Sequence, residues 1–320
     1  MSRSASPCLG EARAIVEAPC ELGEGPSWDA RRGEFRWLDI LGRRFHRYRL
    51  EDGDHRSQAL DELVSFAAPL TSGDDLLVTE HGLKERDHAH GGVSPWREVE
   101  AANPVTRSND ARIDRHGGLW FSTMGKAAEA AAGSLYRLHR GEVFCLKQDI
   151  TIPNALCFSP DGRLGYFTDT ATGVVMRWAL DAEGFPLRQD GGAFLQDGVA
   201  ARPEQLAEPE PWADFNDDPG NPDGAVIDAD GYMWLALWGS GRVARLTPDG
   251  EEVGHVRVNA DQPSCPAFGG RELTTLLITT ATEGQREHKE GRQDGATFLF
   301  DLSEALPGVR GLDDPPIALR

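Results

Sequence analysis

Long apolar runs are missing from this 320-residue sequence, and no stretch approaches the ~18 apolar residues that a membrane-spanning helix needs. The first ten residues, MSRSASPCLG, also lack the apolar run of a secretory signal peptide. We therefore expect a protein that neither spans a membrane nor is exported, and we place it in the cytoplasm.

Positive charge is scarce as well. The chain has 33 Lys and Arg against 52 Asp and Glu, which gives a formal net charge of −19. Such a surface repels phosphate backbones and anionic lipid headgroups. We therefore expect no nucleic-acid partner and no membrane partner.

Cysteine is rare, and its five copies are an odd number with no C-x-x-C spacing. This usage predicts reduced thiols in a cytosolic protein rather than a disulfide framework. Cys157 and Cys265 stand in apolar runs and are expected to be small core residues. The sequence also lacks a P-loop, a dinucleotide-binding fingerprint and a G-x-S-x-G elbow, which disfavours nucleotide cofactors and a serine triad.

Short strands and turns dominate what is present. The 36 Gly and 20 Pro are scattered, and apolar residues alternate with a period of two and not 3.6. One pattern recurs in the same register, in which a polar residue is followed four positions later by a bulky one and then by a tight turn. Its clearest copies are EGPSWD (24–29), NDARID (109–114), NALCFS (154–159) and DGAVID (223–228).

Six such units can be counted, of which 65–87 and 264–302 are the most diverged. Successive turns lie roughly 40–44 residues apart, which is close to the period of four-stranded propeller blades. The sequence therefore predicts an all-β, six-bladed β-propeller with four-stranded antiparallel blades.

The domain organisation follows from the same repeat. We expect a flexible N-terminal tail over 1–12 and a single propeller domain over 13–320, with residues near 14–16 closing one blade. The interval between the Asp161 and Asp230 turns, 230 − 161 = 69 residues, is too long for one unit. Its excess falls in an acidic, Pro-rich stretch, 185–221, which we interpret as a long loop.

The register also predicts a metal site. Equivalent residues at the start of each blade's first strand surround the axis of a propeller, and here they are Glu24, Phe66, Asn109, Asn154, Asp223 and Ser264. Four of these six carry a carboxylate or amide oxygen. Convergent oxygen donors suit a hard divalent cation, and the absence of His and Cys argues against a structural zinc site.

At these residues the chain resembles the SMP-30/gluconolactonase/regucalcin-like family. The resemblance spans nearly the whole sequence, and the R-S-N-D, F-S-T-M and A-L-W-G segments are most similar to bacterial aldonolactonases. The matching segments are LGEGPSW (22–28), RSNDARID (107–114), LWFSTM (119–124), GSLYRL (133–138), IPNALCFSPDG (152–162), NPDGAVIDADGYMW (221–234) and PSCPAFGGRELTTLLITTA (263–281).

The resemblance implies a metal-dependent sugar-acid lactonase with one divalent ion. It implies Glu24, Asn154 and Asp223 as metal ligands and Arg107 and Asn109 as substrate-binding residues. Because a lactone is an ester whose hydrolysis passes through an oxyanion, we expect the ion to act as Lewis acid and Asp223 to act as the catalytic base. The sequence departs from animal members at Ala127, where they carry an acidic residue that contacts substrate.

The ends of the second strands are expected at the same mouth and supply possible rim residues. Asp39 and Asp169 there are equally explained as acceptors for neighbouring backbone N–H groups. His81 is the histidine that we would test as a proton shuttle. The other possible rim residues are Met124, Lys126 and Trp238.

Two other functions remain open on the same scaffold, because a fold does not settle a function. One is hydrolysis of another ester or of an organophosphate, and the other is a non-enzymatic calcium-binding propeller. The sequence does not choose among sugar lactones, among Ca²⁺, Mg²⁺, Mn²⁺, Fe²⁺ and Zn²⁺, or among oligomeric states.

Overall fold

The computed structural model describes residues 6–188, 195–196, 199–200, 206–285 and 290–319. Within these residues the chain is almost entirely β-structure, and its two helices are short: the 3₁₀ turn η1 (Thr170–Thr172) and α1 (Leu302–Ala305). Neither is long or apolar enough to cross a membrane. The chain divides into two compact units, Met1–Ala67 with Phe215–Asp313 and Ala68–Asp214 with Asp314–Arg320.

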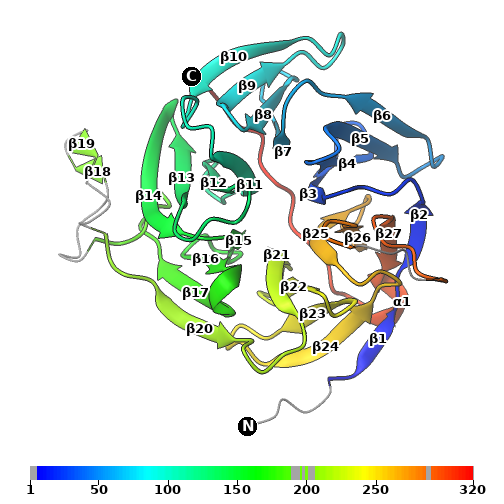
Figure 1. Cartoon of the computed structure of the whole chain (residues 1–320). Coiled ribbons are helices and arrows are strands. Elements are labelled where there is room, and N and C mark those ends of the chain that lie inside the picture. The colour runs from blue at the N-terminus through cyan, green and yellow to red at the C-terminus, as the bar shows by residue number, and fades with distance from the viewer. Residues whose placement is uncertain (1–5, 189–194, 197–198, 201–205, 286–289, 320) are drawn as a thin grey trace. The chain divides into compact units, whose positions relative to one another are not determined.

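The first unit contains three sheets (Figure 1). One sheet has the order β3-β4-β5-β6, with bounds Gly23–Asp29, Glu34–Asp39, Arg44–Arg49 and His55–Ala59. The next has β21-β22-β23-β24, with bounds Asn221–Ile227, Met233–Trp238, Arg242–Leu246 and Glu252–Arg257, and β1 (Cys8–Glu11) on its edge. The third has β25-β26-β27-β2, with bounds Pro263–Gly269, Thr275–Thr280, Thr297–Asp301 and Arg13–Val16.

The second unit has the same plan, and the boundary between the units falls inside β7. Its first sheet is β7-β8-β9-β10, with bounds Val64–Pro69, Asp75–Thr79, Gly82–Arg86 and Val93–Glu98. Its second is β11-β12-β13-β14, with bounds Thr106–Ile113, Leu119–Gly125, Gly133–His139 and Glu142–Ile150. Its third is β15-β16-β17-β20, with bounds Pro153–Phe158, Leu164–Asp169, Val174–Ala179 and Glu210–Asp214.

The predicted fold class, all-β with six four-stranded antiparallel blades, is confirmed sheet by sheet in the described residues. The diverged repeats at 65–87 and 264–302 are blades like the others. The prediction that residues near 14–16 close a blade is also confirmed, because β2 pairs antiparallel with β27.

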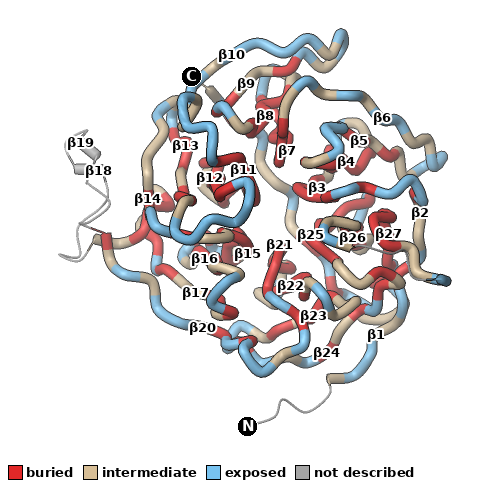
Figure 2. The backbone as a smooth tube through the Cα atoms, viewed as in Figure 1, coloured by how far each residue is buried: buried red, intermediate tan, exposed pale blue. Residues whose placement is uncertain are grey.

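Burial falls from the first strand of each blade to the last (Figure 2). All eight residues of β11 and all seven of β25, which are first strands, are buried. β10 and β6, the last strands of the sheets that begin with β7 and β3, are largely exposed. A polar side chain on a first strand is therefore enclosed by protein and needs hydrogen-bond partners or a ligand there.

Two segments differ from the domain prediction or fall partly outside the described residues. Residues Cys8–Glu11, inside the expected N-terminal tail, form β1 and pair in parallel with β24. Part of the expected loop at 185–221 lies outside the described residues. Its described part includes the short pair β18 (Leu195–Gln196) and β19 (Val199–Ala200), and also β20, which supplies the fourth strand of a blade.

Each unit has its own aromatic core. In the first unit Trp234, Phe268 and Phe298 belong to one buried cluster. In the second, Trp120 packs edge-on against Phe158 at a centroid distance of 5.2 Å. Together with the buried aliphatic residues, these rings supply most of the apolar area that stabilises each unit.

Aspartates fasten the turns between first and second strands. The carboxylate of Asp114 accepts hydrogen bonds from the backbone N–H groups of His116 and Gly118, both at 2.8 Å, and from the indole of Trp120 at 3.0 Å. It also forms a fully buried ion pair with Arg137 at 2.6 Å. Asp228 repeats this arrangement in the first unit with Trp234 and Arg245.

A second buried polar cluster lies in the first blade. The rings of Trp37, His46 and His55 stack, and Nδ1 of His46 lies 3.1 Å from Nε2 of His55. Nε2 of His46 faces the buried Cys20 thiol. Burial, and secondarily the neighbouring His55, lowers the pKa of His46 to about 4. All five cysteines of the chain are free thiols.

Replacing Asp114 with Ala should lower the free energy of unfolding by about 3–5 kcal/mol, because Arg137 would keep a buried charge without its partner. Urea denaturation measures the change. The matched control is Asp161→Ala, in the corresponding turn of β15–β16, where the carboxylate is exposed; it should cost less than about 1 kcal/mol. Equal losses in the two variants would contradict a special role for Asp114.

Acidification should destabilise the protein through His46. The unfolded chain takes up this proton near the ordinary pKa of 6.5, whereas the folded chain does so only near pH 4. Stability contributed by the neutral ring is therefore lost as pH falls from about 6.5 to about 4, by about 2–3 kcal/mol. His46→Phe should flatten this part of the stability–pH curve, and the exposed-site control His90→Phe should not. A wild-type slope in His46→Phe would contradict the assignment.

Candidate functional site

The four predicted oxygen donors share one local geometry. In each of their strands the register against the second strand shifts at or just beside the donor, as in a β-bulge. The shifts fall between Glu24 and Ser27, Ser108 and Ala111, Asn154 and Cys157, and Pro222 and Ala225. Bulges break the two-residue alternation of a strand and re-aim its side chains, which is why they are frequent at functional sites.

In the first unit this geometry holds Glu24 and Asp223, which are only 4% and 5% exposed. The backbone N–H of Gly25 donates to Oε2 of Glu24 at 3.0 Å. Gly25 has a φ of +56°, and a Cβ built there would lie 2.0 Å from the carbonyl oxygen of Ser65. Only glycine therefore fits beside Glu24 without a backbone shift.

Ser264, the predicted sixth position of the ring, supports Glu24 from the neighbouring blade. Its hydroxyl donates to the carbonyl oxygen of Gly23 and lies 2.9 Å from the hydroxyl of Thr279. β25 packs against β3 on one side and β21 on the other. A Cβ at Gly224, next to Asp223, would lie 2.4 Å from the Cys265 sulfur, so this packing is close.

In the second unit the predicted residues form one hydrogen-bonded chain. Nη1 of Arg107 donates to Oδ1 of Asn109 at 2.8 Å, and Nδ2 of Asn109 donates to Oδ1 of Asn154 at 3.0 Å. Nδ2 of Asn154 in turn donates to the hydroxyl of Thr170 at 2.9 Å. Oδ1 of Asn154 has a second lone pair, which is the donor that a cation would use. Arg107 is buried, at the start of β11.

Sequence reasoning missed the carboxylate of Asp110, although it ends the R-S-N-D motif. Oδ2 of Asp110 accepts a hydrogen bond from the backbone N–H of Leu156 at 2.8 Å. It thereby ties the bulge that carries Asn109 to the one that carries Asn154. Burial raises the pKa of Asp110 to about 6. Ala155, which precedes Leu156, has a φ of +57°, so this bond holds an unfavourable backbone conformation in place.

Asp39 and Asp169 are confirmed as backbone acceptors. Oδ1 of Asp39 accepts from the N–H of Leu22 at 3.0 Å, and Oδ1 of Asp169 accepts from the N–H of Ile152 at 2.9 Å. Each carboxylate thus fixes the chain that enters the first strand of its own blade. Their role is to shape the strand entry.

The possible rim residues differ in exposure. His81 is exposed, Trp238 is partly exposed and Met124 is buried. Lys126 is exposed and forms an ion pair with Glu80 at 2.7 Å. Their contact with substrate stays a prediction.

The donor set fits a hard cation better than a zinc cage. No group of three or more His, Cys, Asp or Glu side chains that could hold a metal occurs in the described part of the chain. The predicted set has a different chemistry, two carboxylates and one amide, and all three side chains are buried. Buried carboxylates and amide oxygens suit Ca²⁺, Mg²⁺ or Mn²⁺.

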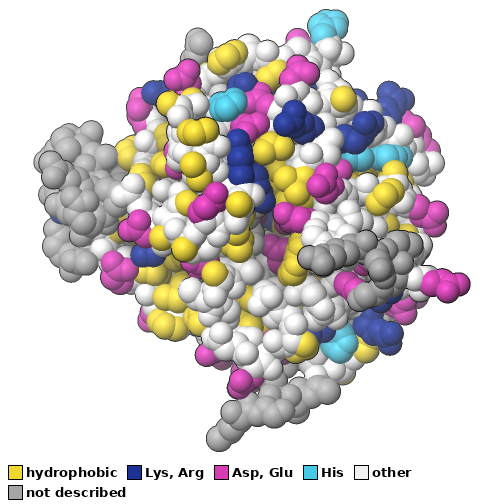
Figure 3. Space-filling model, viewed as in Figure 1, with side chains coloured by type: hydrophobic (Ala, Val, Ile, Leu, Met, Phe, Trp, Pro, Cys, Tyr) yellow, Lys and Arg dark blue, Asp and Glu magenta, His cyan; other side chains and the backbone are white. Residues whose placement is uncertain are grey.

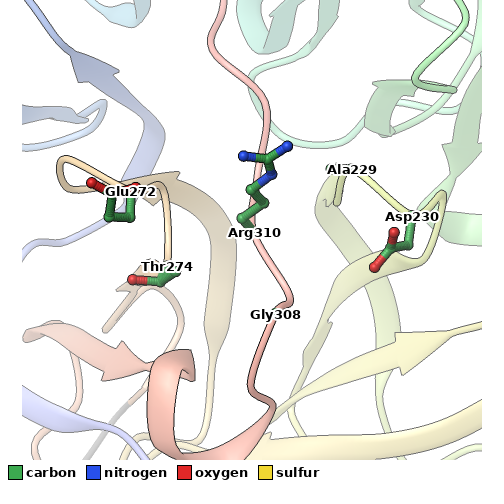
Figure 4. Close-up of a pocket in the computed structure, with 6 residues that line it drawn as sticks. All are labelled: Ala229, Asp230, Glu272, Thr274, Gly308 and Arg310. Atoms are coloured by element: carbon green, nitrogen blue, oxygen red, sulfur yellow. The ribbon is translucent and has the colours of Figure 1, made fainter.

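A cavity of about 490 Å³ lies elsewhere in the first unit (Figure 4). Its lining includes Arg310, which reaches into the space between Asp230 and Glu272. The Asp230 turn follows the end of β21, whereas Asp223 lies near the start of that strand. This cavity is therefore at the opposite strand end from Asp223 and is not the predicted site. Over the face seen in Figure 3, acidic side chains are dispersed and not gathered at one place.

Comparison with known proteins decides the family. The family model described as SMP-30/Gluconolactonase/LRE-like region matches residues 22–191 and 195–282. The chain belongs to this family. The resemblance read from the motifs is thus confirmed over most of the sequence.

Individual relatives match the chain nearly end to end. A protein of Rhizobium meliloti (strain 1021) is 38% identical over 296 residues, which are 92% of this chain and 94% of that one. The 6-deoxy-6-sulfogluconolactonase of Pseudomonas putida is 32% identical, over 92% of this chain and 96% of its own. The pentonolactonase XacC of Haloferax volcanii is 31% identical, over 90% and 94%.

A solved structure of a relative shows the same fold. The calcium-binding protein regucalcin from Agrobacterium tumefaciens str. C58 is 35% identical, with a TM-score of 0.86 over 98% of this chain and 99% of that one. The prediction of a lactonase-type enzyme is confirmed at the level of the family, because several relatives are named lactonases.

Gly25→Ala should lower the free energy of unfolding by about 3 kcal/mol or more, because a methyl group at this φ collides with the Ser65 carbonyl. Gly33→Ala is the matched control. Gly33 has a similar φ of +65° but open space around its Cβ position, so it should cost only the ~1 kcal/mol of left-handed strain. Urea denaturation of both variants separates the collision from the strain. A similar loss in both would show that the close approach at Gly25 is relaxed at little cost.

Proposed function

We propose that this protein hydrolyses a sugar-acid lactone to the open-chain acid with the help of one divalent metal ion. Family membership with relatives named lactonases supports the reaction class. The observation that carries the assignment to this site is the set of buried oxygen side chains, each at a register shift in the first strand of its own blade.

We propose Glu24, Asn154 and Asp223 as the residues that hold the ion. When bound, a divalent cation supplies stabilisation of the oxyanion that develops on the lactone carbonyl and makes water more acidic. The donor set does not distinguish Ca²⁺, Mg²⁺, Mn²⁺, Fe²⁺ or weakly held Zn²⁺. Because the Agrobacterium relative is described as a calcium-binding protein, Ca²⁺ is the ion to test first.

The remaining chemistry belongs to the side chains. Asp223, one of the two carboxylates of the set, accepts the proton of the attacking water. Arg107 and Asn109 hydrogen-bond the hydroxyl and ring oxygens of the sugar and orient the carbonyl. Their mutual bond at 2.8 Å orders both before substrate arrives.

The substrate that we propose is an aldonolactone, because relatives are named a 6-deoxy-6-sulfogluconolactonase, a pentonolactonase and an L-arabinolactonase. The free thiols of all five cysteines support a cytoplasmic location. A second candidate is calcium binding without catalysis. It is favoured by the calcium binding that is named for the Agrobacterium relative. The two candidates differ in whether acid is released from a lactone.

Acid release from a panel of aldonolactones, followed with a pH indicator, tests the proposal. We expect turnover that is lost in EDTA and restored by adding one divalent metal back. Asp223→Ala should reduce kcat to less than about a tenth of the wild-type value, since it removes the base and a ligand. Asp230→Ala, at the other end of β21, is the control and should keep full activity. Turnover above a tenth in Asp223→Ala would remove this residue from the mechanism, and no acid release from any lactone would favour calcium binding.

A further inference from the structure

A carboxylate outside the predicted site binds three hydroxyl groups of one blade. Oε1 of Glu100 accepts hydrogen bonds from the hydroxyls of Tyr136 at 2.6 Å and Thr123 at 2.9 Å, and Oε2 accepts from Thr106 at 2.6 Å. These donors lie on β13, β12 and β11, so one side chain joins three adjacent strands. Hydrogen bonds to an ionised acceptor are short and strong, which fits these distances.

The backbone around this carboxylate is also fixed. Glu100 has a φ of +51°, and its carbonyl oxygen accepts a hydrogen bond from the N–H of Asn103 at 2.7 Å. Thr123 also accepts from the N–H of Ser134 at 3.1 Å. Burial, and next the hydrogen bond to Glu100, raises the pKa of Tyr136, so its hydroxyl stays a donor. A non-glycine residue held at positive φ marks a position that its surroundings determine strongly.

The strand register places this cluster on the opposite face of the β11–β12 pair from Arg107, a predicted substrate residue. Arg107 pairs with Met124, whereas the flanking pairs are Thr106 with Gly125 and Ser108 with Thr123. Successive residues of a strand point to opposite faces of the sheet. Thr106 and Thr123 therefore lie on one face of the β11–β12 pair, with the Glu100 carboxylate, and Arg107 and Met124 lie on the other.

We propose that Glu100 is a positioning residue that holds the end of the β11–β12 pair in place and thereby sets the orientation of Arg107 toward the substrate. This inference rests on the proposed function for its kinetic consequence. Its structural part, the immobilisation of residues 104–108 by Glu100, stands independently. The orientation of a substrate-binding group matters for the rate, because a displacement of about 1 Å lowers the rate about 100-fold.

The kinetic test compares Glu100→Ala in two backgrounds. In the otherwise wild-type protein we expect kcat/KM for the lactone to fall about tenfold or more, mainly through KM. In an Arg107→Ala background the same change should have less than about a twofold effect, since there is no guanidinium left to orient. A tenfold loss in both backgrounds would overturn the proposal, because Glu100 would then act through general stability of the blade.

Conservative variants keep the test valid if Glu100→Ala folds poorly. Glu100→Gln retains the shape and one acceptor oxygen and should recover most of the lost activity. Thr106→Val removes one donor without changing volume and should raise KM in the same direction as Glu100→Ala. The control is Glu142→Ala on β14, an exposed carboxylate of the same blade, which should leave KM unchanged.

Hydrogen exchange measured by mass spectrometry supplies a readout that needs no turnover. Peptides covering 103–108 and 121–126 should exchange faster in Glu100→Ala than in Glu142→Ala and the wild type. Unchanged exchange would overturn the proposal even if the kinetics changed. If the wild type releases no acid from any lactone, the proposed function fails, and the exchange measurement still decides whether Glu100 fixes this strand end.

Discussion

Burial of polar side chains in the first strand of each blade is the constraint on which the rest of the structure depends. Those strands are enclosed over nearly their whole length, so a carboxylate or amide there has little access to bulk water. Such a group must bond within the protein or bind a ligand. Asn109 and Asn154 satisfy part of this requirement with each other, and each donor lies at or beside a bulge that re-aims its side chain.

Aspartates at the two ends of one strand have different surroundings. Asp223 lies near the start of β21, at the register shift. Asp228 follows the end of β21, and its carboxylate accepts hydrogen bonds from a backbone N–H of the turn, from the Trp234 indole and from Arg245. The two residues are of the same type, so it is their surroundings that distinguish Asp223, the proposed base, from Asp228, which stabilises the turn. One end of β21 thus carries a carboxylate that stabilises a turn, and the other carries the carboxylate that we propose as the catalytic base.

The fold was predictable because its signals are local. Asp-Gly turns, two-residue alternation and a spacing near 40 residues all repeat along the chain, so six blades and even the closing strand β2 followed from the sequence. β1 was not predictable, because four half-exposed residues that pair in parallel leave no alternating pattern. Register predicts Glu24, Asn109, Asn154 and Asp223 as oxygen donors, and this stays a prediction. Their bulges are visible only in the structure.

The supporting residues were hidden for a different reason. Asp110 bonds a backbone group 46 positions away, and Glu100 bonds a phenol 36 positions away. No sequence motif predicts either contact, because contacts between residues so far apart depend on which strands lie next to each other in the fold. Asp39 and Asp169 show the reverse case, in which an alternative structural role, acceptance of neighbouring backbone N–H groups, is the one observed.

The sheet β25-β26-β27-β2 takes its fourth strand from a segment that precedes the other three by more than two hundred residues. During synthesis β2 emerges early, yet its partner β27 is not made until residues 297–301 have been translated. Until then the ribosome-bound chain carries an unpaired strand edge, the kind of surface that invites association with other chains. Completion of this one sheet thus ties folding of the first unit to a late stage of translation.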